Sequence, residues 1–265
     1  MKAPIGVIDS GVGGLTVAKE IMQLLPDEEI IYIGDTARCP YGPRSAEEVR
    51  KFTWQLALAL SKMNIKMLVI ACNTATAVAL KSLNKKMAFP VIGVIFPGAR
   101  AAIKATKTHE IVVLGTSGTV KSGAYENAIA ALNTSSKVIP LACPTFVPLV
   151  ESNEYEGEFA RKMVYDTLLP LKDEQFDTVI LGCTHYPLLQ KHIEEAVGDK
   201  VKVLSSAQET ASEVLDYLDY HNMHYPIKGK KAPIFYTTGS VPIFKTIVEK
   251  WLEIPNADVR TISFN

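Results

Sequence analysis

Two of the four cysteines in this chain, Cys72 and Cys183, each directly follow a short run of apolar residues. The segments around them are similar: residues 68–74 read LVIACNT, and residues 179–185 read VILGCTH. The two thiols are 183 − 72 = 111 residues apart, which is about the size of one domain. The spacing indicates two halves of similar design, each with one cysteine at the end of a strand.

Two thiols are suited to inverting the configuration of one carbon atom. Inversion removes a proton from one face of the carbon and delivers another to the opposite face, which a thiolate and a thiol do directly and with exchangeable roles. An isolated thiol has a pKa of about 8.5, so neighbouring groups must set which sulfur holds the proton. His185, close to Cys183 in the sequence, and nearby acidic residues are candidates for that task.

Apolar runs rich in valine and isoleucine alternate with amphipathic segments along almost the whole chain. Strands that are apolar throughout and separated by helices are typical of parallel sheets covered on both faces, so the predicted fold class is α/β. Residues 45–48 have the pattern of a helix capping box and precede an apolar stripe. The predicted strands are residues 5–8, 30–33, 67–71, 91–95, 111–114, 137–141, 178–181, 201–204 and 234–236.

A ligand site is expected in the residues that follow these strands. Ligands of open α/β sheets bind beyond the carboxyl ends of the strands, where helix N-termini also offer free N–H groups to an anion. Five strand ends are small, hydroxyl-rich or acidic, and two of them carry a thiol. They are Asp9-Ser10-Gly11, Gly34-Asp35-Thr36, Cys72-Asn73-Thr74, Gly115-Thr116-Ser117-Gly118-Thr119 and Cys183-Thr184-His185.

The composition limits the classes of partner. Lys plus Arg and Asp plus Glu both number 28, so the formal net charge is zero and gives no electrostatic reason to expect nucleic acid or a membrane surface. The N-terminal residues lack the apolar segment and cleavage site of a signal peptide, and no apolar run is long enough to span a bilayer. We therefore expect a cytoplasmic protein that acts on a small molecule.

Two other ligand types fit the sequence less well. Gly11-Val12-Gly13-Gly14 resembles the start of a dinucleotide fingerprint, but Thr16 stands where its third glycine would be, and Asp9 would repel a phosphate. A tight strand-to-helix turn is the preferred interpretation of these glycines. Cys183 and His185 lack a second Cys or His pair at a familiar ligand spacing, so no metal site is predicted.

Three interpretations of the cysteines stay open at this level. The first is a two-thiol acid/base pair, the second is a single Cys–His nucleophile with the other cysteine as packing, and the third is a ligand-binding module without chemistry. Mutating each cysteine separately distinguishes the three. Cys39 fits either a core or a site position. The other cysteine and the four remaining histidines are expected to be structural: Cys143, His109, His192, His221 and His224.

Several short motifs together resemble the bacterial glutamate racemases, of the PLP-independent aspartate/glutamate racemase superfamily. They are GVIDSGVGGLT at 6–16, PYG at 40–42, ACNTA at 71–75, GT at 115–116 and LGCTHYP at 181–187. The motifs spread over most of the chain in the expected order. The resemblance implies an enzyme that interconverts L- and D-glutamate without a cofactor. It also implies a cytoplasmic homodimer that supplies D-glutamate for peptidoglycan.

The resemblance also assigns roles to residues. It implies that Cys72 and Cys183 are the acid/base pair, that Asp9 assists Cys72, and that His185, oriented by Glu151, assists Cys183. It implies two pseudo-symmetric domains with the active site in the cleft between them, the first formed by residues 1–96 and 207–265 and the second by 97–206. The substrate is expected to contact Asp9, Ser10, Tyr41, Gly42, Asn73, Thr74, Thr116, Thr184 and His185.

Overall fold

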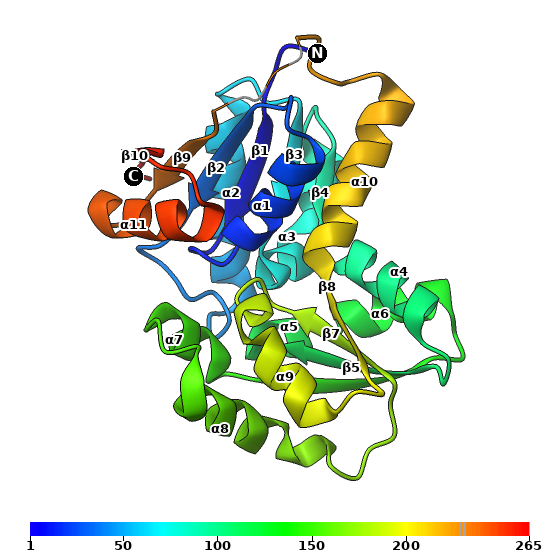
Figure 1. The fold of residues 1–265 in the computed structure, drawn as a ribbon. Helices are drawn as coiled ribbons and strands as arrows, with labels where there is room; N and C mark the ends of the chain where they lie inside the picture. The colour runs from blue at the N-terminus through cyan, green and yellow to red at the C-terminus, as the bar shows by residue number, and fades with distance from the viewer. Residues whose placement is uncertain (228, 230–231, 265) are drawn as a thin grey trace.

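The computed structural model describes residues 1–227, 229 and 232–264 and contains two separate sheets (Figure 1). The strands are β1 (Ile5–Asp9), β2 (Ile30–Gly34), β3 (Met67–Ile70), β4 (Val91–Gly93), β5 (Glu110–Gly115), β6 (Lys137–Ala142), β7 (Thr178–Gly182), β8 (Lys202–Ser205), β9 (Ile234–Thr237) and β10 (Asp258–Thr261). The first sheet has the order β10-β9-β2-β1-β3-β4, and the second has the order β6-β5-β7-β8. All strand pairs described are parallel, which confirms the predicted α/β class.

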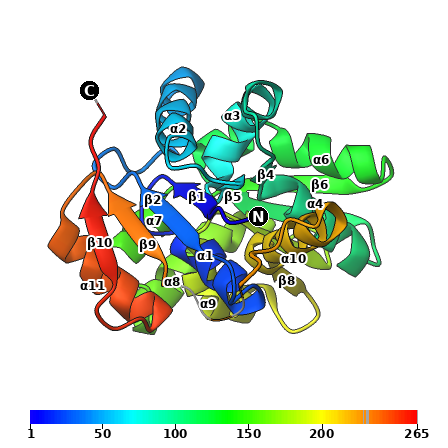
Figure 2. The same cartoon turned by 90° about the horizontal axis from the view of Figure 1, so that it is seen from above.

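Helices cover both faces of each sheet, as strands that are apolar on both sides require (Figure 2). They are α1 (Leu15–Leu24), α2 (Ala46–Ser61), α3 (Asn73–Lys86), α4 (Ile95–Ala105), α5 (Ser117–Lys121), α6 (Ala124–Leu132), α7 (Phe146–Glu151), α8 (Gly157–Leu168), α9 (Gln190–Val197), α10 (Ser206–His221) and α11 (Val241–Leu252), with 3₁₀ turns η1 (Leu169–Leu171) and η2 (Tyr186–Leu189). On the first sheet, α1, α10 and α11 pack on one face and α2 and α3 on the other. On the second sheet, α7, α8 and α9 lie opposite α4 and α6.

All nine strands predicted from the sequence are present, and the structure adds β10. The sequence of β10, DVRT, gives no apolar signal because this strand lies at the sheet edge with mostly exposed side chains. The predicted strand at 91–95 is too long, since β4 ends at Gly93 and Ile95 already begins α4. Val94 and Ile95 are buried beneath neighbouring elements, and an apolar run alone does not distinguish a strand from a buried helix start.

The capping box predicted at residues 45–48 is confirmed. The Ser45 hydroxyl accepts the Glu48 backbone N–H at 3.2 Å, and the Ser45 N–H donates to the Glu48 carboxylate at 3.2 Å. Because both orphan N–H groups are satisfied, the chain turns sharply into α2 at this point. The capping box fixes the α2 end of the segment between β2 and α2, and this segment contributes to the cavity described below.

The chain passes from the first sheet to the second and back again. Strands β1 to β4 and later β9 and β10 belong to the first sheet, whereas β5 to β8 form the second. On its return the chain forms α10, which packs against α1 (Figure 1). The discontinuous domains expected from the resemblance, with the division at residues 96 and 207, stay a prediction.

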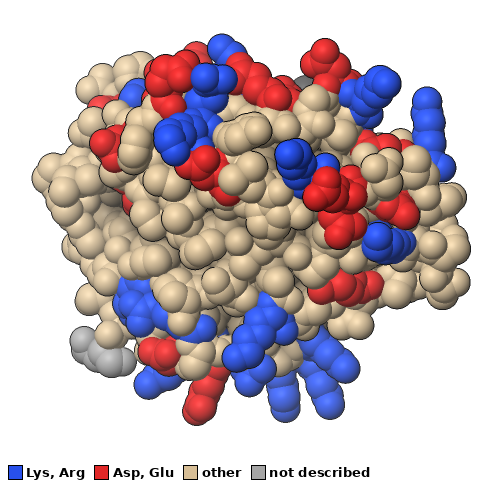
Figure 3. Space-filling view, turned by 90° about the horizontal axis from the view of Figure 1, so that it is seen from below, with Lys and Arg blue, Asp and Glu red and all other residues tan. Residues whose placement is uncertain are grey.

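Charged side chains of both signs are spread over the surface. On the face seen from below, acidic and basic side chains stand mostly around the rim, and uncharged atoms fill much of the centre (Figure 3). Neither positive nor negative side chains dominate this face, so it has no extended electrostatic field of one sign that would attract a highly charged polymer. In the part of the chain that the structure describes, no helix combines the length and apolar character needed to cross a membrane.

Candidate active site

The two cysteines follow inner strands of different sheets, and both line the same cavity. Cys72 follows β3 and is the N-cap of α3, where its Sγ accepts the backbone N–H of Ala75 at 3.4 Å. Cys183 follows β7, directly before the turn into η2. Both side chains are nearly buried, at 6% and 7% exposure. The residues that line the cavity are Ser10, Pro40, Tyr41, Gly42, Cys72, Asn73, Thr74, Thr116, Val147, Cys183, Thr184 and His185.

The cavity between the two cysteines is small. Its volume is about 20 Å³, which is space for little more than one water molecule. An amino acid is several times larger, so the walls must move apart before a substrate can enter. Those walls come from both sheets, which makes a relative movement of the two halves the direct way to open the cavity.

Cys183 lies beside a buried imidazole that is paired with a more exposed carboxylate. The Nδ1 atom of His185 is 3.9 Å from the Cys183 Sγ, and its Nε2 atom is 2.6 Å from the Glu151 Oε1. Burial by itself lowers the pKa of His185, but hydrogen bonds to Cys183 and Glu151 and the negative charges of these groups outweigh burial and raise it to about 10. At neutral pH the imidazole is therefore protonated and bridges the carboxylate and the sulfur.

Cys72 has a different electrostatic environment. Burial, followed by the negative charge of Asp9, raises the pKa of Cys72 to about 12, although hydrogen bonds from Ala75 and Ser10 act in the opposite direction. Asp9 is itself buried, and this raises its pKa despite the nearby His185 and a 2.9 Å hydrogen bond from the Gly11 N–H. Cys72 is therefore a neutral thiol at neutral pH, next to a carboxyl group that takes up protons more readily than usual.

Hydroxyl groups from both halves meet on another wall of the cavity. The Thr74 Oγ1 lies 2.8 Å from the Thr116 Oγ1 and 3.2 Å from the Thr119 Oγ1. Thr74 lies in the first turn of α3, whereas Thr116 is the N-cap of α5 in the other half. None of the lining residues described is a lysine or arginine, so a carboxylate in this cavity would be held by hydroxyls and helix N-termini.

The Asn73 side chain is fixed by a tyrosine from the opposite half. The Tyr125 hydroxyl donates a 2.8 Å hydrogen bond to the Asn73 Oδ1, and both residues are buried. The Asn73 Nδ2 is also buried and has no hydrogen-bond partner among the described residues. A buried N–H₂ group without a partner, on a residue that lines the cavity, is suited to donate to a bound carboxylate.

The glycines after β1 allow parts of the two halves to approach closely. A Cβ atom on Gly13 would lie 2.4 Å from the His185 Nδ1 and 2.4 Å from the Thr184 Oγ1. A Cβ atom on Gly14 would lie 2.5 Å from the Asp9 Cβ. The tight turn expected from the sequence is present, and it leaves space for the side chains of Asp9, Thr184 and His185.

The structure brings the sequence-predicted site residues together in two layers. The cavity is lined by all of them except Asp9 and Glu151, which lie behind it. Asp9 accepts a 3.4 Å hydrogen bond from the Thr184 hydroxyl, and Glu151 bonds to His185. Cys39, left undecided by the sequence, has its Sγ 3.8 Å from the Glu151 Oε1. The contribution of Tyr125 is not apparent from the sequence, because its partner lies 52 residues away.

The remaining cysteine and histidines lie outside the site. Cys143 is a buried core residue, as predicted. His109 occupies a turn with φ of 61°, and His192 lies beside Glu195. His221 packs against the rings of Tyr217 and Tyr220, and His224 contacts Asp219. Over the described residues, no three His, Cys, Asp or Glu side chains are grouped so that they could hold a metal ion.

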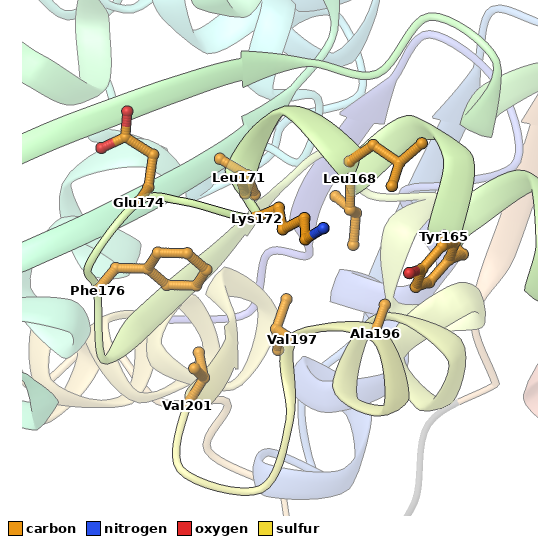
Figure 4. Close-up of a pocket in the computed structure, with 10 residues that line it drawn as sticks. Tyr165, Leu168, Leu171, Lys172, Glu174, Phe176, Ala196, Val197 and Val201 are labelled. Atoms are coloured by element: carbon orange, nitrogen blue, oxygen red, sulfur yellow. The ribbon is translucent and has the colours of Figure 1, made fainter.

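A larger cavity lies between α8 and α9, away from the cysteines (Figure 4). Its volume is about 270 Å³. Leu168, Phe176 and Val197 contribute apolar side chains to it, and Lys172 and Glu174 also line it (Figure 4). Neither Cys72 nor Cys183 lines it.

The fold and the site together define a class of protein: two α/β halves that each present one thiol to a shared cavity. The family described as Asp/Glu/Hydantoin racemase matches residues 5–214. A glutamate racemase of Lysinibacillus sphaericus (strain C3-41) is 67% identical over 263 residues, which cover 99% of each chain. The chain therefore belongs to the Asp/Glu/hydantoin racemases, a PLP-independent family of amino-acid racemases.

Solved structures support the same assignment. The crystal structure of glutamate racemase isoform RacE1 from Bacillus anthracis is 48% identical, with a TM-score of 0.96 over 99% of this chain and 98% of that one. A glutamate racemase from Francisella tularensis, solved with D-glutamate, is 32% identical, with a TM-score of 0.92 over 98% and 97% of the two chains.

Proposed function

We propose that this racemase interconverts L- and D-glutamate by proton transfer between the substrate Cα and the two thiols. The observation that carries the proposal is that Cys72 and Cys183, from different sheets, line one cavity. Glutamate is the substrate named for the relatives, and the Francisella tularensis enzyme was solved with D-glutamate. The hydroxyl and amide groups that line the cavity are suited to bind the carboxylates of such a substrate.

The reaction begins with the thiols in different protonation states. A protonated His185, 3.9 Å from the Cys183 sulfur, stabilises negative charge on that sulfur, whereas Cys72 holds its proton. The Cys183 thiolate takes the proton from Cα, and the electron pair of the C–H bond stays on the carbon. The Cys72 thiol then delivers its proton to the opposite face, which leaves Cys72 as the thiolate. In the reverse direction the two sulfurs exchange these roles.

Several groups support the intermediate and restore the thiols. The N–H group of Asn73 and the hydroxyls of Thr74 and Thr116 hold the substrate carboxylates and spread the charge that develops at Cα. Asp9, beside Cys72, takes up and returns the proton that resets this sulfur, and His185 does so for Cys183. Following the family resemblance, we place the activity in the cytoplasm, in a homodimer that supplies D-glutamate for peptidoglycan.

Racemisation in D₂O tests this proposal. Purified protein is incubated with L-glutamate without added cofactor, circular dichroism follows the loss of optical activity, and NMR follows deuterium at Cα. Cys72→Ala and Cys183→Ala should each abolish racemisation, whereas Cys143→Ala, which removes a buried thiol outside the cavity, should retain it. Full activity after loss of either cavity cysteine would refute the two-thiol mechanism. Turnover of aspartate instead of glutamate would refute only the substrate.

A further inference from the structure

One buried carboxylate near the site has no part in the proton transfers described above. Asp35 follows β2 directly, its side chain is fully buried, and its backbone N–H donates to the Asp9 carbonyl at 3.0 Å. A buried carboxylate is costly unless several donors satisfy it. The position of Asp35, at the start of the segment that supplies Pro40, Tyr41 and Gly42 to the cavity, raises the question of what it holds.

Three side chains donate to the Asp35 carboxylate. The Arg38 Nε donates to the Oδ2 at 2.7 Å, and the Tyr41 hydroxyl donates to the same oxygen. The Thr238 hydroxyl donates to the Oδ1 at 2.8 Å and also accepts the Ala37 backbone N–H at 3.0 Å. Both oxygens are satisfied, and the partners come from the loop itself and from the segment after β9.

Two of the partners of Asp35, Arg38 and Tyr41, are themselves anchored to α2. The Arg38 guanidinium lies 4.1 Å from the centroid of the Phe52 ring and donates to the Gln55 Oε1 at 2.6 Å. The Tyr41 ring packs on the same phenylalanine, with the ring centroids 5.7 Å apart. The phenol of Tyr41 is therefore directed at Asp35, while Tyr41 also lines the cavity together with its neighbours Pro40 and Gly42.

The far end of the loop reaches the opposite half. The Gly42 carbonyl accepts the backbone N–H of Gly118 in α5 at 2.9 Å. A Cβ atom on Gly42 would lie 2.8 Å from the Cβ of Thr116, so the two segments are in direct contact. Displacement of the loop would move one wall of the cavity and also the threonine that faces it.

We propose that Asp35 is a positioning residue that holds the Pro40–Tyr41–Gly42 loop in place to bind glutamate, by clamping it to Arg38, Tyr41 and Thr238. The proposal rests on the proposed function, because it concerns the affinity of that site for its substrate. Asp35 does not line the cavity, so it acts through the loop. Contacts made equally to the substrate and the transition state change KM and leave kcat largely unchanged.

Asp35→Asn is the main test, with steady-state racemisation of both glutamate enantiomers as the assay. The variant keeps the shape of the side chain but removes the charge that pairs with Arg38, and loss of such a buried bond should raise KM by about tenfold or more. The expected kcat stays within about threefold of the wild type. The matched control is Asp177→Asn, which disrupts a carboxylate that anchors the Thr106–Thr108 turn at the other end of the second sheet. That control should keep the wild-type KM.

A second variant decides the question if Asp35→Asn does not fold. Thr238→Val removes the bonds to Asp35 and to the Ala37 backbone without touching the cavity, and it should raise KM in the same direction by a smaller factor. Unchanged KM in the folded variants, or an equal rise in Asp177→Asn, would overturn the positioning role. Wild-type protein that does not racemise glutamate would instead overturn the proposed function, and the positioning role with it.

Discussion

The hydrogen bond between Tyr125 and Asn73 allows a quantitative test of how the two halves cooperate. Tyr125→Phe removes only the hydroxyl that donates to the Asn73 Oδ1 at 2.8 Å. Asn73 is 2% exposed, so water cannot readily replace the lost donor. An unsatisfied buried acceptor costs about 1–3 kcal/mol, and the free energy of unfolding should fall by that amount.

The same loss should affect catalysis through the orientation of the Asn73 amide. With the Oδ1 held by Tyr125, the Nδ2 is left for a substrate carboxylate, whereas an unanchored amide can rotate by half a turn. If loss of this hydrogen bond destabilises the transition state by the same ~1–3 kcal/mol, kcat/KM for glutamate falls by about 5- to 150-fold. The assay combines urea unfolding with racemisation rates for both enantiomers.

Thr178→Val is the control for Tyr125→Phe. It removes another buried hydroxyl, which donates to the Asp177 Oδ1 at 2.9 Å, from the end of β7 opposite Cys183. Its stability should fall while kcat/KM stays at the wild-type value. A Tyr125→Phe enzyme with wild-type kcat/KM, or one impaired only as much as Thr178→Val, would refute the role of the amide orientation.

Three further variants test other features. Glu151→Gln removes a negative charge that raises the pKa of His185, which in the wild type loses its proton near pH 10. The alkaline limb of the pH–rate profile should therefore move to lower pH in this variant. A limb that does not move would contradict the pairing of Glu151 with His185. Gly13→Ala places a Cβ 2.4 Å from the His185 Nδ1 and should lower kcat/KM by about tenfold or more, and an unimpaired variant would show that this contact yields easily. Burial works against ionisation of Asp177, but hydrogen bonds led by that from Thr106 hold its pKa below the ordinary value. The ionised Asp177 therefore stabilises the fold above a pH of about 3.9, and this effect is lost as the pH falls through the folded-state pKa. In urea unfolding, the free energy of unfolding of Asp177→Asn should approach that of the wild type only in acid. A difference that does not change with pH would contradict this.

The strands and the positions of the two cysteines could be predicted because they depend on local patterns. An apolar run followed by small polar residues marks a strand end, and strand ends of parallel sheets meet at one edge. The edge strand β10 lacks that pattern. It pairs with a neighbouring strand along one edge only, and its side chains are mostly exposed, so they need not be apolar. Residues such as Tyr125 act through a single contact across the cleft, and that contact exists only after both halves have folded.

Asp35 illustrates an intermediate case. Its place after β2 marks it as a candidate, but the sequence does not distinguish a turn former from a residue that binds a ligand or holds a loop. The donors that decide among these roles, Arg38, Tyr41 and Thr238, come from positions three, six and 203 residues away. Only the first two could be guessed from proximity in the chain, and proximity does not give the direction of a side chain.

The two halves present equivalent thiols in unequal surroundings. Thermodynamics limits how far these unequal surroundings can make the two directions of the reaction differ in rate. Cys72 caps an α-helix beside Asp9, whereas Cys183 precedes a 3₁₀ turn beside His185 and Glu151. Enantiomers have the same free energy in water, so kcat/KM must be equal in the two directions for the wild type and for every variant. A change at Glu151 can therefore alter kcat and KM differently for L- and D-glutamate, but both kcat/KM values must fall by the same factor. Unequal factors would show that glutamate racemisation is not the reaction being measured.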